Sequence, residues 1–250
     1  MAAVYPDYVA RFYDVIYAQV RTTDHDYYLK KILAANGSVL EIGVGTGRFF
    51  LDALNSGADV FGIDASETML QVLKQQLDPS HHFRISNQQA EEFSLERKFD
   101  LIIAPFRVFS HLVTIEQQLH ALERIHLHLN ENGIFIFDLF VPNLKLLAEG
   151  GMSEHVDFKG EYEPGKKLQR ITSFQTDYMN QVNNVTMRYE WEENDDMNSH
   201  SWTFQMRYFF HWEIEHLIAR SPLKLETIYG DYEENPLRNE SNDFVVVCRK

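Results

Sequence analysis

The sequence predicts an α/β fold in which a parallel sheet carries helices on both faces, with an antiparallel sheet inserted into the second half of the chain. Through the first 140 residues, apolar runs of strand length alternate with helix-like patterns, which is typical of parallel strands joined by helices. After about residue 150, segments rich in Thr, Tyr, Trp and Phe alternate with period two, which favours antiparallel strands.

The first half supplies the parallel strands and the helices between them. The predicted strands are apolar runs at 38–43, 58–64, 82–86, 99–104 and 133–140, of which 82–86 is the weakest. The predicted helices are a tyrosine-rich stretch at 7–35, a short one at 47–56, a segment capped by Ser66, and 114–130. Thr114 and Gln117 form a capping-box pattern at the start of the last helix, and Gly133 marks its end.

The second half supplies the antiparallel strands. The clearest are 168–178, 184–192 and 201–210, and the loop at 194–199 suits a hairpin. A helix at 211–221 stops at Pro222, and strands at 223–230 and 243–250 close the main sheet. We therefore expect a main domain, 1–150 with 211–250, and an inserted antiparallel subdomain, 151–210.

Composition and charge exclude several classes of function. The formal net charge is −14 and no stretch has five consecutive basic residues, which argues against a nucleic-acid surface. The single cysteine, Cys248, excludes an internal disulfide and a multi-cysteine metal site. The N-terminus lacks a basic leader, and the longest apolar run, 134–140, is far shorter than the ~20 residues of a membrane span. We expect a soluble, cytoplasmic protein.

The glycine-rich turn EIGVGTG at 41–47 predicts a nucleotide site between a strand and a helix. A dinucleotide fold needs G-x-G-x-x-G, but after Gly43 and Gly45 the third position falls on Arg48. The spacing G-x-G-x-G, with Glu41 two residues before the first glycine, is instead the hallmark of S-adenosylmethionine sites. Asp64, at the end of the next strand, would hold a ribose diol in either class. Glycines kept for packing alone are the alternative.

Four segments resemble the successive motifs of class I S-adenosylmethionine-dependent methyltransferases: VLEIGVGTGRFF, VFGIDASETMLQVLKQ, KFDLIIAPFRVFSHL and LNENGIFIFDLFVPN. They cover about 35–145. The resemblance implies a Rossmann-like, doubly wound sheet of seven strands whose last strand is antiparallel, and the segment 223–249 fits the closing hairpin of that fold. It also implies S-adenosyl-L-methionine as the cofactor and methyl transfer as the reaction.

The resemblance assigns parts of the cofactor to parts of the chain. The amino-acid part lies against the glycine backbone, the ribose on Asp64, and adenine between Ala65 or Met69 and the segment after the third strand. Many relatives have an aspartate in that segment, where this chain has Gln89-Ala90-Glu91. The implied cofactor residues are Tyr13, Glu41, Gly43, Gly45, Gly47, Asp64, Ala65, Met69, Gln89, Ala90, Glu91 and Pro105.

A small molecule is the expected methyl acceptor. The segment after the fourth strand reads APFR and not the (N/D)PP(Y/F) of enzymes that methylate DNA bases or glutamine side chains, and the paired glutamates of protein arginine methyltransferases are absent. The pattern F-R-x-F-x-H-L at 106–112 resembles a bacterial group of small-molecule methyltransferases and, more distantly, nucleotide-linked amino-sugar N-methyltransferases. Those relatives also begin with a tyrosine-rich helix and insert antiparallel strands after the fifth strand.

The residues expected near the methyl acceptor each have two possible roles. Tyr13 and Tyr17 would lie over the methionine end of the cofactor, where an aromatic face attracts the sulfonium, or are helix surface. His111 is the candidate general base, with hydrogen bonding or substrate positioning as the alternative. Arg107 would bind an acidic group of the substrate or pair with a surface acid. The catalytic pair is His111 with Tyr13, and the substrate set is Tyr17, Phe106, Arg107, His111, Trp191 and Tyr208. No metal is assigned, since the histidines lack ligand spacing.

The inserted sheet has more aromatic surface than its strands need. One face would roof the substrate while the other packs on the main domain or on a second subunit, which would make a homodimer; core packing alone is the alternative. Methyl transfer to an amine or hydroxyl of a small molecule is the predicted function. The alternatives are an NAD(P)-dependent oxidoreductase and a non-catalytic S-adenosylmethionine-binding protein.

Overall fold

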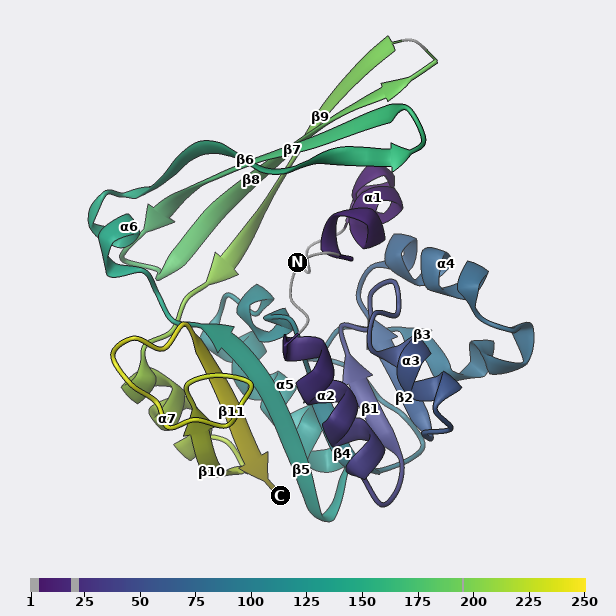
Figure 1. Cartoon of the computed structure of the whole chain (residues 1–250). Helices are drawn as coiled ribbons and strands as arrows, with labels where there is room; N and C mark the ends of the chain where they lie inside the picture. Colours follow the sequence, from purple (N-terminus) through teal and green to yellow (C-terminus); the bar gives the residue numbers. More distant parts are fainter. Residues whose placement is uncertain (1–4, 19–22, 195) are drawn as a thin grey trace.

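The computed structural model describes residues 5–18, 23–194 and 196–250, and its strands form two sheets (Figure 1). The main sheet has seven strands in the order β10-β11-β5-β4-β1-β2-β3, and the second has four in the order β6-β7-β8-β9. The strands of the main sheet are β1 (Val39–Ile42), β2 (Val60–Asp64), β3 (Ile85–Asn87), β4 (Phe99–Ala104), β5 (Leu129–Phe140), β10 (Lys224–Tyr229) and β11 (Asp243–Arg249).

Helices cover both faces of the main sheet. The helices are α1 (Asp7–Tyr17), α2 (Thr23–Ala34), α3 (Phe50–Asn55), α4 (Glu67–Gln76), α5 (Ile115–His128), α6 (Leu144–Ala148) and α7 (His211–Ala219), with short 3₁₀ helices η1 (Pro79–Arg84) and η2 (Val108–His111). Neighbouring residues of one strand enter different hydrophobic clusters: Ile102 packs with residues of α5 and α7, and Ile103 with residues of α2, α3 and α4. The sheet is therefore buried on both faces, as its apolar strands predicted.

The strand directions confirm the predicted Rossmann-like sheet. β1 pairs in parallel with β2 and β4, and the pairs β2–β3 and β4–β5 are also parallel. The last strand, β11, is antiparallel to both of its neighbours, β5 and β10. Because parallel strands end on the same edge, the carboxyl ends of β1, β2 and β4 lie together, which is where open α/β sheets form their ligand crevice.

Several predicted boundaries differ from the structure. The stretch predicted as one helical region, 7–35, forms α1 and α2, and residues 19–22 lie outside the described ranges. The weak strand predicted at 82–86 is mostly η1, because Pro79 starts a tight turn that Asp78 caps through the Ser80 amide. The capping box of Thr114 and Gln117 is confirmed, but α5 ends at His128 and β5 begins at the next residue.

The second sheet confirms the predicted antiparallel insertion and adds a strand to it. It consists of β6 (Gly151–Glu163), β7 (Lys166–Asp177), β8 (Val182–Glu193) and β9 (Asp196–Arg207), and each neighbouring pair is antiparallel. The sequence did not reveal β6, because this edge strand is largely exposed and polar. The hairpin predicted at 194–199 is shorter, since Glu193 already pairs with Asp196.

Helix α1 packs against the second sheet. Its buried residues Val9, Phe12 and Ile16 form one hydrophobic cluster with side chains of β7, β8 and β9, among them Tyr189 and Trp202. Figure 1 shows α1 lying between the second sheet and the main sheet. Across the described ranges, no helix has both the length and the apolar character needed to span a membrane.

Candidate active site

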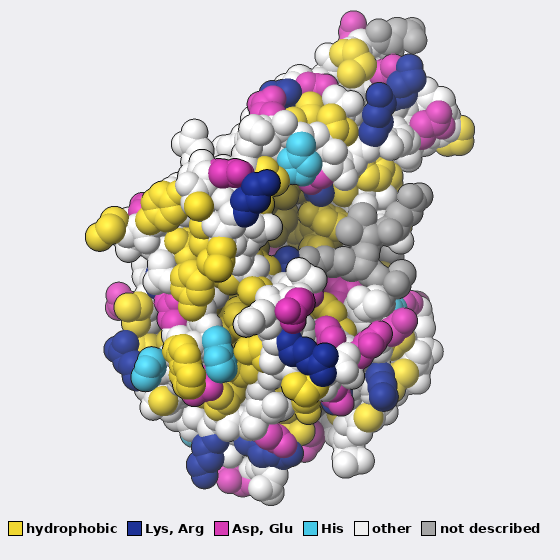
Figure 2. Space-filling model, turned by 60° about the vertical axis from the view of Figure 1, so that its left-hand side comes forward, with side chains coloured by type: hydrophobic (Ala, Val, Ile, Leu, Met, Phe, Trp, Pro, Cys, Tyr) yellow, Lys and Arg dark blue, Asp and Glu magenta, His cyan; other side chains and the backbone are white. Residues whose placement is uncertain are grey.

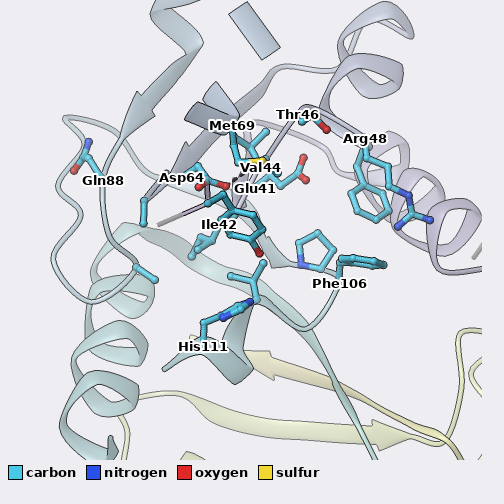
Figure 3. A pocket seen from close by; sticks show the side chains of 18 of the residues that line it. Glu41, Ile42, Val44, Thr46, Arg48, Asp64, Met69, Gln88, Phe106 and His111 are labelled. Carbon is cyan, nitrogen blue, oxygen red and sulfur yellow. Dashed lines mark hydrogen bonds between the residues drawn. The ribbon is translucent and has the colours of Figure 1, made fainter. Parts of the chain in front are cut away.

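A cavity lies at the carboxyl ends of β1, β2 and β4, where α1 also contributes side chains (Figure 3). Ten of the predicted cofactor residues line it: Tyr13, Glu41, Gly43, Gly45, Asp64, Ala65, Met69, Ala90, Glu91 and Pro105. Further lining comes from residues that the sequence did not single out for this role, including Tyr5, Thr46, Arg48, Gln88 and Val108. Of the other predicted cofactor residues, Gly47 lines an adjacent hollow and Gln89 does not line this first cavity.

Two glycines of the turn after β1, Gly43 and Gly45, line the cavity. Gly43 and Gly45 have positive φ values of 74° and 57°, which favour residues without a side chain. A Cβ on Gly43 would also fall 2.3 Å from a methyl group of Val108, on the segment after β4. The turn can therefore bring its backbone close to the cavity only because these positions are glycine.

Two acids face this cavity, the buried Glu41 and the partly buried Asp64. Asp64 ends β2, and its carboxylate accepts hydrogen bonds from the backbone amides of Gly45 and Ser66, both at 2.8 Å. Burial raises the pKa of Asp64 to about 6, although those two hydrogen bonds oppose the shift. Glu41 is 1% exposed, and its Oε2 has no partner among the described residues. Burial and then the charge of Asp64 raise the pKa of Glu41 well above its ordinary value.

The segment after β4 is held by a buried carboxylate. Phe106 and Arg107 both have left-handed backbones, with φ of 60° and 64°. Asp138, on β5, accepts hydrogen bonds from their amides at 2.8 and 3.1 Å. The hydroxyl of Tyr28 donates to the same carboxylate at 2.7 Å. Asp138 therefore fixes an uncommon turn whose side chains reach the cavity, although it does not line the cavity itself.

His111 lies at the end of η2, across the cavity from Glu41, Asp64 and Met69 in Figure 3. Burial lowers the pKa of His111 to about 4, and a hydrogen bond with the Gln205 backbone opposes the shift. Its Nδ1 is buried without a partner among the described residues. The imidazole is therefore neutral at pH 7, and a neutral imidazole that donates one N–H can accept a hydrogen bond at its other nitrogen.

A second cavity lies under the second sheet and adjoins the first. Figure 2 shows a hollow with hydrophobic side chains between the two parts of the molecule. The two cavities share Tyr5, Tyr13, Phe106 and His111 in their linings. The remaining lining of the second cavity is Val9, Tyr17, Arg107, Asp157, Arg170, Met187, Tyr189, Trp202, Phe204 and Met206.

The predicted substrate residues lie in different places. Tyr17, Phe106, Arg107 and His111 line the second cavity. Trp191 and Tyr208 do not: Trp191 packs in the cluster that α1 forms with the second sheet, and Tyr208 is buried elsewhere. Arg107 forms an ion pair with Asp243 of β11, so its guanidinium is matched by an acid of the main sheet.

Comparisons with known proteins agree with this architecture. A family model described as a methyltransferase domain matches residues 39–133. A glycine/sarcosine N-methyltransferase of Aphanothece halophytica is 23% identical over 251 residues, which cover 97% of this chain and 88% of that protein.

Solved structures share the fold of the whole chain. An S-adenosylmethionine-dependent methyltransferase from Clostridium acetobutylicum has a TM-score of 0.77 at 17% identity, with 95% of each chain covered. The S-adenosylmethionine-bound amino pentose methyltransferase CalS10 from Micromonospora echinaspora has a TM-score of 0.70 at 16% identity, again over 95% of each chain. Residues 39–133 thus match a methyltransferase domain, and the whole chain has the fold of solved S-adenosylmethionine-dependent methyltransferases.

Proposed function

We propose that the chain transfers the methyl group of S-adenosylmethionine to an amine or hydroxyl of a small molecule bound in the second cavity. The observation that carries this proposal is the shared wall: the two cavities meet at Tyr5, Tyr13, Phe106 and His111. A donor in the first cavity and an acceptor in the second would meet there. One relative is named a glycine/sarcosine N-methyltransferase and another an amino pentose methyltransferase, and both names favour an amine as the acceptor. A hydroxyl acceptor stays open as the alternative.

The first cavity fits the cofactor. Its two acids suit a ligand that carries an ammonium and a sulfonium, and the unpartnered Oε2 of Glu41 can accept a hydrogen bond from it. Asp64 would accept the ribose hydroxyls, and Ala65, Met69, Ala90 and Glu91 would surround the adenine. The ring of Tyr13 lies in the shared wall, where an aromatic face would attract the sulfonium.

The residues of the shared wall would act mainly by position. S-adenosylmethionine supplies an already activated methyl group, so the protein has to align the acceptor and exclude water. The rings of Tyr13, Tyr17 and Phe106 contact one another, with centroids 4.6 Å apart for the two tyrosines and 5.1 Å for Tyr17 and Phe106. His111 would accept a hydrogen bond from the acceptor N–H or O–H and direct a lone pair of that acceptor atom toward the methyl group.

The experiment that tests this proposal is a coupled methyltransferase assay on a panel of amine and hydroxyl metabolites, after calorimetry has shown cofactor binding. Turnover of at least one acceptor is expected. A protein that binds the cofactor and turns over no acceptor would be the non-catalytic alternative. Fluorescence titration with NADH tests the oxidoreductase alternative, for which we expect no binding.

Cofactor affinity should depend on pH through Asp64. The ionised carboxylate accepts the ribose hydroxyls, so binding favours the deprotonated form and lowers its pKa from about 6. We expect affinity to fall as the pH drops through 6, by up to about tenfold per pH unit, with Glu41 acting in the same direction. Calorimetry between pH 5 and 8, in buffers of different ionisation enthalpy, measures the affinity and the protons released. An affinity that is flat over this range, with no proton release, would contradict the assignment.

His111 should behave as a hydrogen-bond acceptor more than as a titrating base. Because its pKa is near 4, protonation of His111 should not limit the rate above about pH 5. We expect His111→Ala to lower kcat about 10²-fold and His111→Gln, which keeps an acceptor oxygen, to retain more activity. Steady-state kinetics with an acceptor from the assay panel measures this. A wild-type pH–rate limb near pH 6 to 7 that disappears in both variants would instead show general-base catalysis.

The second sheet together with α1 is proposed as the substrate-binding unit. The proposed division of the chain is a main domain, 1–150 with 211–250, and an inserted subdomain, 151–210. This proposal rests on the second cavity, to which β6, β7, β8, β9 and α1 all contribute. The homodimer stays a prediction, and elution at the mass of a monomer in size-exclusion chromatography would count against it.

A further inference from the structure

The wall of the second cavity contains a buried ion pair. Arg170, on β7, is 5% exposed and donates through Nε and Nη2 to the carboxylate of Asp157, on β6, each at 2.9 Å. Its Nη1 donates to the hydroxyl of Tyr17 at 2.9 Å. Thr172 donates to the same Asp157 carboxylate at 2.9 Å. The positive charge of Arg170 is therefore matched inside the wall before any ligand binds.

The charges of the other basic groups of this lining are also matched. Arg107 pairs with Asp243 through Nη2, both side chains are about one-fifth exposed, and the buried Nε of Arg107 has no partner among the described residues. His111 is neutral at pH 7. Among the described lining residues, each cation of the second cavity thus has its own carboxylate. An anionic ligand would have to bury a charge without a counter-charge, and this costs far more than burying a neutral group.

The rest of the wall is apolar or aromatic. Trp202 and Phe204 stack with ring centroids 4.1 Å apart, and the ring of Tyr5 lies 4.6 Å from that of Trp202. The thioethers of Met187 and Met206 add adaptable apolar surface. The uncharged polar groups of the wall include the hydroxyls of Tyr5, Tyr13, Tyr17 and Tyr189. The Tyr17 hydroxyl accepts from Arg170 and has no acceptor for its own proton among the described residues, so it can donate to a ligand. Flat aromatic surfaces with uncharged hydroxyls suit a ring with a neutral polar substituent.

We propose that the second cavity selects an uncharged acceptor built on a flat, largely apolar ring, and that it rejects carboxylates and nucleotide-linked substrates. The acceptor hydroxyl or neutral amine would face His111, and a second polar substituent would face Tyr17. This rests on the proposed function, because it names the substrate class of the same site. It also means that glycine, which carries a carboxylate, is not expected to be an acceptor for this chain.

The test compares two ligands that share a ring and differ in charge. The protein is saturated with S-adenosylhomocysteine and titrated at pH 7.5 with 2-(4-hydroxyphenyl)ethanol, which is uncharged, and with 4-hydroxyphenylacetate, which is an anion. Glycine and uridine diphosphate glucose are titrated in parallel, and saturation-transfer NMR gives the dissociation constants. The uncharged ring should bind at least about tenfold more tightly than each of the other three ligands.

Three variants locate the effect. Asp157→Asn keeps the shape of the side chain but removes the charge that matches Arg170, so the anionic ring should gain affinity and the preference should narrow or reverse. Thr172→Val removes only a hydrogen bond to Asp157 and should keep the wild-type preference. Met187→Trp should fill the second cavity and abolish binding of both rings without changing the affinity for S-adenosylhomocysteine, since Met187 does not line the first cavity.

The outcomes separate this proposal from the proposed function. Binding of the anionic ring, glycine or uridine diphosphate glucose to the wild type as tightly as the uncharged ring would overturn the proposal. A wild type that binds S-adenosylhomocysteine but neither of the two ring ligands would also overturn the proposal. Failure to bind S-adenosylhomocysteine would instead overturn the proposed function. Calorimetry with S-adenosylhomocysteine shows whether each variant is folded. If Asp157→Asn is not folded, the comparison of the four ligands on the wild type decides the proposal by itself.

Discussion

Replacing Asp64 with alanine should weaken S-adenosylmethionine binding by about 1–3 kcal/mol, or roughly five- to 150-fold. The variant removes the carboxylate proposed to accept the ribose hydroxyls. It also leaves the amides of Gly45 and Ser66 without their acceptor, so the glycine turn loses a restraint. Isothermal titration calorimetry measures the change.

A matched control lies just before β2. Asp59 pairs with Arg84 and does not line the cofactor cavity. Asp59→Ala therefore removes a carboxylate from the same region of the chain and should leave the affinity unchanged. Equal losses in the two variants would show a general effect of charge or stability and would contradict the assignment of Asp64.

Replacing Asp138 with alanine should lower kcat about 10²-fold while changing cofactor affinity much less. The carboxylate is fully buried and holds the amides of Phe106 and Arg107 in left-handed conformations. Without it the turn should relax, and a displacement of about 1 Å in a positioning group can cost this much in rate. The variant should also lose stability, because buried amides lose their acceptor. Steady-state kinetics and calorimetry on the same preparations measure the split.

The hydroxyl of Tyr28 offers the control for Asp138. Tyr28→Phe removes one hydrogen bond to the carboxylate but leaves both amides of the turn bound. Its kcat should therefore stay close to wild type, apart from a modest loss of stability. If Tyr28→Phe lowers kcat as much as Asp138→Ala, the turn is not the feature through which Asp138 acts.

The sequence predicted the main sheet well because its signals are local. The apolar run 99–104 matches β4 residue for residue, and the cap at Thr114 forms as expected. The edge strand β6 was missed because a strand with both faces largely exposed has no hydrophobic period. Local sequence patterns also could not predict that α1 packs on the second sheet, since the contacting residues Phe12 and Trp191 are far apart in the chain.

The cofactor cavity could be predicted because its residues lie in one turn and at the ends of successive strands. The second cavity could not, because it joins α1, β6, β7 and β8 through side chains such as Tyr17, Asp157 and Arg170. One signal for this cavity was present: Arg170 is a charged residue on the same face of its strand as Leu168. Asp138, an acid within an apolar strand, was a separate signal for the turn after β4. Trp202 and Phe204 lie in the strand predicted at 201–210, but its alternation does not show which of its aromatic residues line a cavity.

Calorimetry of the purified chain with S-adenosylmethionine and S-adenosylhomocysteine is the decisive measurement of cofactor binding. We expect one site per chain with a dissociation constant near the micromolar range, roughly −8 kcal/mol of binding free energy, and proton release on binding below about pH 7. Absence of binding by both compounds at concentrations well above this range, with or without binding of NADH, would contradict this expectation.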